Sequence, residues 1–170
     1  MQFKPPFQGL MAAPHTPMRE NGDLNMDMVP LQADHLVNTG VRGAFVCGTT
    51  GECQSLTINE RRELAEAWVA ASAGRLVLNV HVGTNSARES AELARHAKKI
   101  GANAISASPP CFFKAASNQE LLEFQMEVAA GAADIPFYHY HIPIFSGHHL
   151  AVAPFLKIAS GKIPNLVGVK

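Results

Sequence analysis

The pattern of hydrophobic and polar positions switches repeatedly along the chain between one typical of strands and one typical of helices. Short apolar runs bounded by glycine, proline or asparagine predict strands that are buried on both faces. There are six such runs, at residues 9–13, 43–47, 76–82, 104–107, 135–140 and 166–169. Longer segments between them carry apolar residues at helical spacing, and the predicted helices are 27–39, 57–72, 86–100, a helix from 117 through at least 128, and 153–159. A strand followed by a helix therefore recurs about every 30 residues, which predicts an α/β fold with a parallel sheet.

Three of the predicted helices begin with the same signal. Thr57, Ser86 and Ser117 are each followed three residues later by a glutamate. A hydroxyl at the N-cap with glutamate at the third helical position is the capping-box pattern. Gly101 is placed to close the helix that begins at Ser86, because glycine readily takes the left-handed conformation found after a helix.

Two architectures satisfy this strand–helix order. An open doubly wound sheet usually has a glycine-rich phosphate loop after its first strand, whereas here residues 11–17 read Met-Ala-Ala-Pro-His-Thr-Pro. A closed (β/α)₈ TIM barrel needs about 250 residues. The 170 residues contain about six β/α units. We therefore expect a parallel TIM barrel in which residues 1–170 form a single domain that is truncated or interrupted after strand six.

The amino-acid composition limits the classes of partner that we expect the protein to bind. Fourteen Lys and Arg balance fourteen Asp and Glu, so no basic face is implied and neither nucleic acid nor an anionic membrane is an expected partner. Residues 1–6 lack the apolar core of a signal peptide, and no apolar run is long enough to span a bilayer. Cys47, Cys53 and Cys111 follow no metal-ligand spacing. We expect a soluble cytoplasmic protein with free thiols.

Lys170 follows the last predicted strand directly. The carboxyl ends of parallel strands share one face, where active sites gather. If that strand is buried, partial desolvation of the ammonium lowers the lysine pKa from about 10.4. A neutral amine is what Schiff-base chemistry with a carbonyl requires. The alternative is that Lys170 is simply the polar residue that closes a strand.

Two further groups fall at the same expected rim. The turn from Gly48 to Glu52, with Thr49, Thr50 and Gly51 between them, follows the second strand. Its hydroxyls and backbone N–H groups can hold a carboxylate. Tyr140 ends the fifth strand, where its phenol can carry a proton or simply pack with a hydrogen-bonded tip. Together these groups would give an amine nucleophile both an anion cradle and a proton carrier.

Three segments resemble the signatures of a known superfamily. They are Gly48-Thr-Thr-Gly-Glu52, Tyr140-His-Ile-Pro143 followed by Gly147, and Gly168-Val-Lys170. Their order and spacing resemble the superfamily of N-acetylneuraminate lyases and dihydrodipicolinate synthases, and the likeness is strongest to the lyase branch. These proteins are class I aldolases built on a (β/α)₈ barrel, and the resemblance runs from about Gly9 to Lys170.

The resemblance implies a role for each matched position. Lys170 would form the imine with the substrate ketone, and Tyr140 would transfer protons as the C3–C4 bond of a sialic acid breaks. Thr49 and Thr50, in the loop bounded by Gly48 and Gly51, would bind the carboxylate at the pyruvate end. No metal and no cofactor are implied, because the lysine supplies the electron sink. The expected partners are a small-molecule substrate and further copies of the same chain, in a homo-oligomer expected to be a tetramer.

Two departures from the superfamily pattern bear on the reaction. The synthase branch uses an arginine shortly after the tyrosine motif, whereas Ile144-Phe-Ser146 stands here. Many members place a tyrosine just after the fourth strand, whereas this chain has Cys111-Phe-Phe113. Both differences favour the lyase over the synthase. Another 2-keto-acid aldolase of the superfamily and a non-catalytic binding protein that keeps the anion cradle remain as alternatives.

The histidines allow a second interpretation of the rim. His139 and His141 lie two apart on a strand, with His148 and His149 close behind in sequence. A metal cluster is conceivable, but no carboxylate or cysteine completes a ligand set, so strand-end polar residues are the preferred interpretation. His81 ends the third strand and is expected to be a core histidine with satisfied hydrogen bonds, although it could line a pocket. Cys47 and Cys111 are interpreted as small apolar residues near the rim, and Glu52 as a turn-stabilising residue rather than a base.

Overall fold

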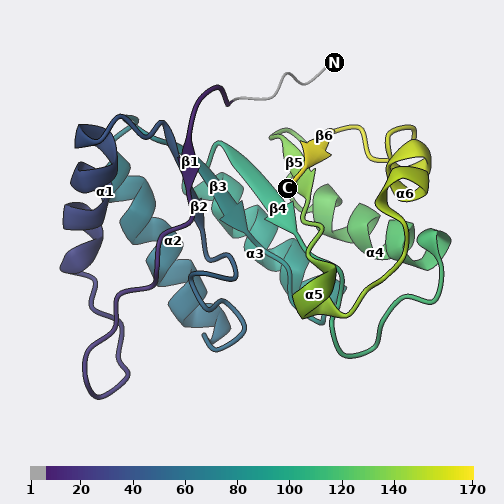
Figure 1. Cartoon of the computed structure of the whole chain (residues 1–170), viewed down its shortest axis with the longest axis horizontal. Coiled ribbons are helices and arrows are strands. Elements are labelled where there is room, and N and C mark those ends of the chain that lie inside the picture. Colours follow the sequence, from purple (N-terminus) through teal and green to yellow (C-terminus); the bar gives the residue numbers. More distant parts are fainter. Residues whose placement is uncertain (1–6) are drawn as a thin grey trace.

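Six parallel strands form one sheet whose spatial order follows the sequence (Figure 1). The computed structural model describes residues 7–170. The strands are β1 (Met11–Ala12), β2 (Gly43–Val46), β3 (Val77–His81), β4 (Ala104–Ala107), β5 (Phe137–His139) and β6 (Leu166–Val169). Every neighbouring pair is parallel. A doubly wound sheet reverses its strand order at a switch point, and no reversal occurs here. The described residues therefore form five successive β/α units of the barrel type followed by a sixth strand.

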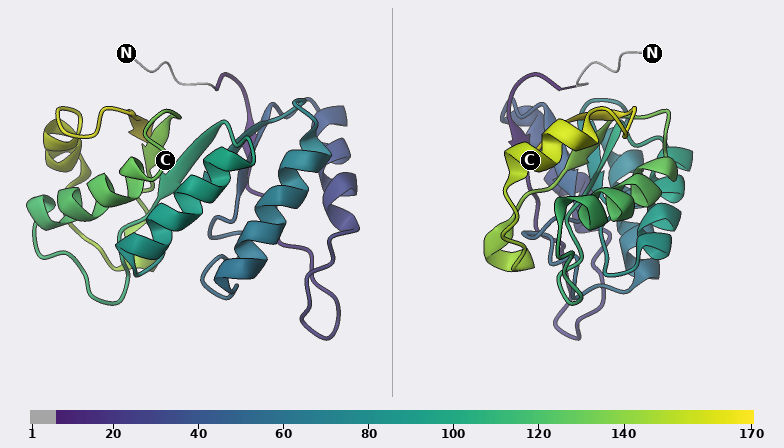
Figure 2. Two further views of the ribbon diagram at one scale, coloured as in Figure 1. Left: turned by 180° about the vertical axis from the view of Figure 1, so that it is seen from behind. Right: turned by 90° about the vertical axis from the view of Figure 1, so that its right-hand side faces the viewer.

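The helices lie mainly against one face of the sheet. They are α1 (Met28–Asn38), α2 (Ile58–Ser72), α3 (Ala87–Lys99), α4 (Asn118–Ala130), α5 (Pro143–Ser146) and α6 (Val152–Ala159). Helices α2, α3 and α4 stand in front of the sheet when it is seen from behind (Figure 2). The apolar core fills the space between these helices and the strands, in one cluster around α3, α4 and β4 and another around α1, α2 and β2.

The predicted elements are all present, with shorter boundaries for some strands. The first strand is only Met11–Ala12, against the predicted 9–13, and β5 is 137–139, against 135–140. The short helix α5 was not predicted. A proline at its first position and Gly147 in the left-handed region after it define this single turn.

The predicted caps differ in how complete they are. Thr57 forms both reciprocal bonds of the capping box with Glu60. Ser86 and Ser117 accept the N–H of the third helical residue. At the latter helix the Glu120 carboxylate accepts instead from the Ala116 N–H, one residue before the N-cap. Gly101 takes a positive φ of 94°, one residue after the C-cap, as its sequence position predicted.

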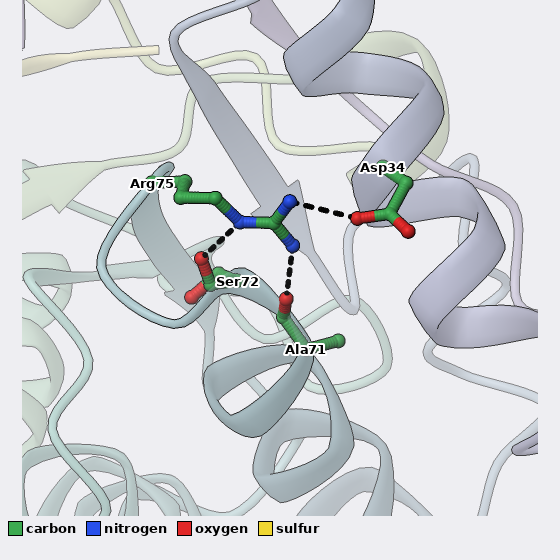
Figure 3. Close-up of polar contacts among 4 residues, drawn as sticks. All are labelled: Asp34, Ala71, Ser72 and Arg75. Atoms are coloured by element: carbon green, nitrogen blue, oxygen red, sulfur yellow. Dashed lines mark hydrogen bonds and ion pairs between the residues drawn. The ribbon is translucent and has the colours of Figure 1, made fainter.

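A single arginine ties the end of α2 to α1. Arg75 Nη1 lies 2.8 Å from the Asp34 carboxylate, and the same guanidinium donates to the carbonyls of Ala71 and Ser72 at 2.8 and 3.2 Å (Figure 3). The last carbonyl groups of a helix receive no hydrogen bond from an N–H group of the same helix. Arg75 therefore satisfies two of them while it fixes the neighbouring helix.

The expectation that residues 166–169 are buried on both faces is wrong. Leu166, Val167 and Gly168 are half-buried, and Val169 and Lys170 are exposed. The reason is position in the sheet, because β6 pairs with β5 on one side only among the described residues.

No helix among residues 7–170 is both long enough and apolar enough to cross a membrane. Residues 1–6, where the sequence shows no signal-peptide pattern, lie outside the described residues.

His139 is buried between the sheet and helix α6. His139 is 1% exposed, its ring centroid lies 4.5 Å from that of Phe155, and its Nδ1 has no hydrogen-bond partner among residues 7–170. Burial, together with His141 and His148, lowers the pKa of His139 from 6.5 to about 3. The core therefore holds this ring in its neutral form.

We predict that Gly131→Ala destabilises the fold through the contact between α3 and α4. A Cβ at Gly131 would overlap the Ala91 carbonyl and lie 3.0 Å from the Ala94 Cβ, so the helices would have to separate. Overpacking of this kind costs about 1–3 kcal/mol, measured by urea unfolding. Gly161→Ala is the matched control, since the nearest atom to its added Cβ lies 4.0 Å away. Equal stability of the two variants would contradict this account.

We predict that His139 makes stability fall in acid. Its folded-state pKa of about 3 lies below the unfolded value of 6.5, so the unfolded chain binds the proton first. The stabilisation is complete above pH 6.5 and is lost as the pH falls toward 3, at up to about 1.4 kcal/mol per pH unit. Denaturant unfolding between pH 7 and pH 4.5 should show a shallower slope for His139→Gln than for the unmodified protein. Gly131→Ala, destabilised without loss of a histidine, should keep the original slope, and a His139→Gln slope equal to it would refute the prediction.

Candidate active site at the carboxyl ends of the strands

Tyr140 and Lys170 are neighbours across two adjacent strands. The Lys170 N–H donates to the His139 carbonyl at 2.9 Å, and the His141 N–H donates to the Lys170 carbonyl at 2.8 Å. These bonds extend the β5–β6 ladder by one residue and set Tyr140 opposite Lys170. Residues opposite each other on parallel strands project to the same face.

A one-residue bulge in β6 produces this pairing. Phe137 pairs with Leu166, but Tyr138 pairs with Gly168, so Val167 is extra. Side chains alternate between faces along a strand, and a slip of one residue reverses the face. If Val167 instead paired with Tyr138 in a regular ladder, Lys170 would stand opposite His141 and project to the other face of the sheet. The bulge therefore turns the lysine to the same face as the Tyr140 phenol.

The side chains on this face are in direct contact. Lys170 Nζ lies 4.2 Å from the centroid of the Tyr140 ring and 4.2 Å from that of Phe45. The two rings meet edge to face, with centroids 5.1 Å apart. The Tyr140 hydroxyl and Thr49 Oγ1 are 3.0 Å apart and hydrogen-bonded. The structure thus brings together three of the residues selected from sequence: Thr49, Tyr140 and Lys170.

Two hydrogen bonds hold the loop that carries Thr49, one from outside the loop and one within it. Thr16 Oγ1 donates to the Gly51 carbonyl at 2.6 Å, and the Glu52 N–H donates to the Thr49 carbonyl at 3.0 Å. Gly48 is needed because a Cβ there would overlap the Phe45 ring. Among residues 7–170, the backbone N–H groups of Thr49 and Thr50 form no hydrogen bond. They remain available to an anion.

Thr50 differs from the other selected residues. It is exposed and does not line the cavity next to Thr49. Thr49 and Tyr140 line a cavity of about 330 Å³, whose wall continues over Ser108, Ile142 and Phe145. Lys170 and Phe45 line a neighbouring hollow of about 300 Å³. The Tyr140 ring lines the first space and contacts the lysine that lines the second.

His81 is both a satisfied core histidine and a wall of the cavity. It is 2% exposed, its Nδ1 lies 3.1 Å from the Cys47 carbonyl, and its Nε2 lies 3.2 Å from Ser108 Oγ. Burial, with a contribution from the positive charge of Arg61, lowers the pKa of His81 to about 3. The core role predicted from sequence is therefore confirmed, and His81 also lines the cavity, as the alternative interpretation had it.

Arg61 was missed by the sequence reasoning. It is 3% exposed, and its guanidinium donates to the carbonyls of His81 and Gly83 at 2.7 and 3.0 Å. Its place in α2 carried a signal, since it stands three and four residues before the buried Leu64 and Ala65 and so belongs to the apolar stripe. A charged residue on a buried stripe implies a buried polar partner.

The remaining candidates take structural positions. The ring centroids of His139 and His141 lie 6.1 Å apart, yet residues 7–170 contain no group of three or more potential ligands that could hold a metal ion. The cysteines of the described chain are free thiols. Burial raises the pKa of Cys47 to about 12, so its thiol is not a ready nucleophile. Glu52 is exposed at a positive φ of 54° and lines the cavity, as a turn residue of the loop.

Comparison with known proteins agrees with this architecture. The chain is 44% identical to the N-acetylneuraminate lyase of Rattus norvegicus, over 98% of this chain and 53% of that protein. It superimposes on the Proteus mirabilis N-acetylneuraminate lyase with a TM-score of 0.93 at 43% identity, over 96% of this chain and 55% of that one. A prophage protein of the dihydrodipicolinic acid synthase family from E. coli K12, solved in complex with pyruvate, gives a TM-score of 0.91 at 28% identity, over 98% of this chain and 55% of that one.

The chain spans about half the length of the curated relatives that it matches. Within that span, the family model described as the dihydrodipicolinate synthetase family matches residues 6–170, nearly the whole sequence. The sequential parallel sheet and the cluster of Thr49, Tyr140 and Lys170 at its carboxyl rim fit that match. The chain belongs to the dihydrodipicolinate synthetase family.

Proposed function

We propose that this protein is a Schiff-base-forming aldolase that cleaves N-acetylneuraminate reversibly to N-acetylmannosamine and pyruvate. The observation that carries the proposal is the contact of the Lys170 amine with the ring of Tyr140, whose hydroxyl is hydrogen-bonded to Thr49. An amine, a phenol and a hydroxyl in contact at one rim supply the groups that this reaction needs. The names of the 42–44% identical curated relatives supply the substrate.

Lys170 supplies the electron sink of the reaction. Its neutral amine adds to the C2 ketone of the open-chain sugar acid, and water leaves as the imine forms. When the C3–C4 bond breaks, its electron pair moves toward the protonated imine and gives an enamine. The enamine takes a proton at C3, and water then hydrolyses the imine, which releases pyruvate and the free amine. No cofactor takes part in this sequence.

Tyr140 transfers the proton, and the loop of Thr49 binds the substrate carboxylate. Tyr140 acts in the cleavage step as its phenolate, which accepts the proton of the C4 hydroxyl as that carbon becomes the aldehyde. The phenol so formed gives a proton to C3 of the enamine, and both transfers run backward in the reverse direction. Thr49 holds the phenol oxygen through the 3.0 Å bond, and the N–H groups of Thr49 and Thr50, which form no hydrogen bond among residues 7–170, would bind the substrate carboxylate. Gly48 and Gly51 bound this loop, and Gly48 lets its backbone approach the Phe45 ring.

Another 2-keto-acid aldolase of the same family is the second candidate. The family takes its description from a synthase, so the Schiff-base half of the chemistry does not by itself select the aldehyde. Against the synthase stands the absence of an arginine in the segment Ile144–Ser146. A substrate panel decides between the candidates. Cleavage of another 2-keto-3-deoxy acid with N-acetylneuraminate inert would overturn our first choice.

We further propose that residues 1–170 belong to one barrel domain and that the protein works as a homo-oligomer, a tetramer, in the cytoplasm, in sialic acid catabolism. The free thiols and the names of the lyase relatives support this setting.

We predict that pyruvate and borohydride together modify Lys170 irreversibly. Reduction converts the imine to a stable secondary amine and adds a pyruvate-derived group, which peptide mass spectrometry assigns to a residue. Lys170→Arg keeps the positive charge but forms no imine, so it should show no adduct at this position and no lyase activity. Binding of pyruvate to the unmodified protein without any adduct would point to a non-catalytic binding protein instead.

We predict that Tyr140→Phe separates imine formation from bond cleavage. Loss of the phenol should lower kcat for N-acetylneuraminate cleavage by about 10²–10⁴, the usual contribution of a general acid–base group. The pyruvate adduct at Lys170 should still form. Tyr138→Phe is the matched control, because it removes the hydroxyl of the tyrosine two residues earlier, which lines the hollow beside Lys170, and it should keep kcat within about threefold. Similar losses in both variants would argue against a specific role for Tyr140.

A further inference from the structure

His81 connects the ends of four consecutive strands. It ends β3, bonds to the carbonyl of Cys47 just after β2, and bonds to Ser108 just after β4. Its ring also meets the Tyr140 ring, beyond β5, edge to face with centroids 5.4 Å apart. His81 lines the cavity, but the proposed reaction assigns it no step.

The hydrogen-bond partners define which ring nitrogen carries the proton. A carbonyl oxygen only accepts, so Nδ1 must donate to Cys47. The backbone N–H of Ser108 only donates, and it points at Nε2 from 3.3 Å. Nε2 is therefore the unprotonated nitrogen, and the ring is neutral with one fixed tautomer. The burial that lowers its pKa acts in the same direction.

The close approach of β3 and β4 depends on a glycine. A Cβ at Gly83 would lie 2.9 Å from His81 Nε2 and 2.9 Å from the Ser108 nitrogen. A side chain there would push apart the two groups that fix the tautomer. The contact between His81 and Ser108 is thus built into the backbone as well as into the side chains.

The bond to Cys47 reaches the loop that carries Thr49. Cys47 has a φ of 57°, in the left-handed region that non-glycine residues rarely occupy, and it immediately precedes Gly48. Strain of this kind persists only where surrounding contacts hold it. The contacts close a ring: His81 holds Cys47, Cys47 leads into Thr49, Thr49 bonds to Tyr140, and the Tyr140 ring packs on His81.

We propose that His81 is a positioning residue, a neutral imidazole whose hydrogen bond to the Cys47 carbonyl fixes the Thr49 loop and thereby the Thr49–Tyr140 hydrogen bond used for proton transfer. This inference rests on the proposed function. His81 acts through the loop and does not itself exchange a proton with substrate.

Exchange of the C3 hydrogens of pyruvate for deuterium tests this role. Exchange requires the imine to lose and regain a proton at C3, and NMR in D₂O measures its rate. His81→Phe keeps a ring next to Tyr140 but loses the donor to Cys47. It should slow exchange on the order of 100-fold, the size of loss expected from misplaced groups, while the borohydride-trapped fraction of Lys170 stays within about twofold. Exchange at the unmodified rate would overturn the proposal.

His81→Asn provides the rescue that a merely structural role would not show. An asparagine Nδ2–H can replace imidazole Nδ1–H as donor to Cys47, so exchange should recover at least about fivefold over His81→Phe. Equal rates for the two variants would refute the route through Cys47. His35→Asn, the same change at an exposed position of α1, is the control and should leave exchange unaltered.

A separate measurement on the unmodified protein does not depend on activity. The ¹⁵N shifts of the His81 ring should report a proton on Nδ1 and none on Nε2 between pH 6 and pH 8. A proton on Nε2 in that range would overturn the proposal even if the protein forms no adduct with pyruvate. Absence of the Lys170 adduct with the expected tautomer present would instead refute the proposed function and leave the arrangement of His81 intact.

Discussion

The register between β5 and β6 is the constraint on which the candidate site depends. One extra residue, Val167, sets Tyr140 rather than His141 opposite Lys170. Because side chains alternate along a strand, this residue decides whether the amine lies on the same face as the phenol or on the other face of the sheet. The hydrogen bonds of the Lys170 N–H and carbonyl groups to β5 then fix this orientation, independently of any side-chain contact. Strand pairing therefore brings Lys170 into the cluster with Thr49 and Tyr140.

A buried positive charge supports the other side of the rim. Arg61 has no carboxylate partner among residues 7–170, and its Nε has no hydrogen-bond partner there. Leaving a guanidinium unpaired in a core is costly unless carbonyl dipoles compensate, and the carbonyls of His81 and Gly83 supply that compensation. The same charge disfavours a second positive charge on His81. Arg61 thus anchors the end of β3 and also helps to keep its last residue neutral.

The sequence predicted the fold well because its signals were local and repeated. Strand and helix periods recur along the chain, and three helices begin at an N-cap hydroxyl. The strand ends then place Thr49, Tyr140 and Lys170 on one rim. The bulge at Val167 left no such signal, since Leu-Val-Gly-Val has no alternation of polar and apolar residues that would show which face each side chain takes. The exposure of Thr50 and the bond from His81 to Cys47 were equally hidden, because both depend on contacts between residues far apart in the chain.

The two halves of the site are held with different strength, and the difference suits the proposed chemistry. The hydroxyls of Thr49 and Tyr140 share a hydrogen bond of 3.0 Å, and His81 bonds to the Cys47 carbonyl at 3.1 Å. The rings of His81 and Tyr140 also meet edge to face. The Lys170 amine is held only by two ring faces and forms no ion pair with a carboxylate of the described chain. Cation–π contacts at exposed positions contribute only about 0.5–1 kcal/mol. A nucleophile must change its bonding during catalysis, whereas a proton carrier must stay in place, so a weakly held amine beside a rigid phenol is the arrangement that an imine-forming site requires.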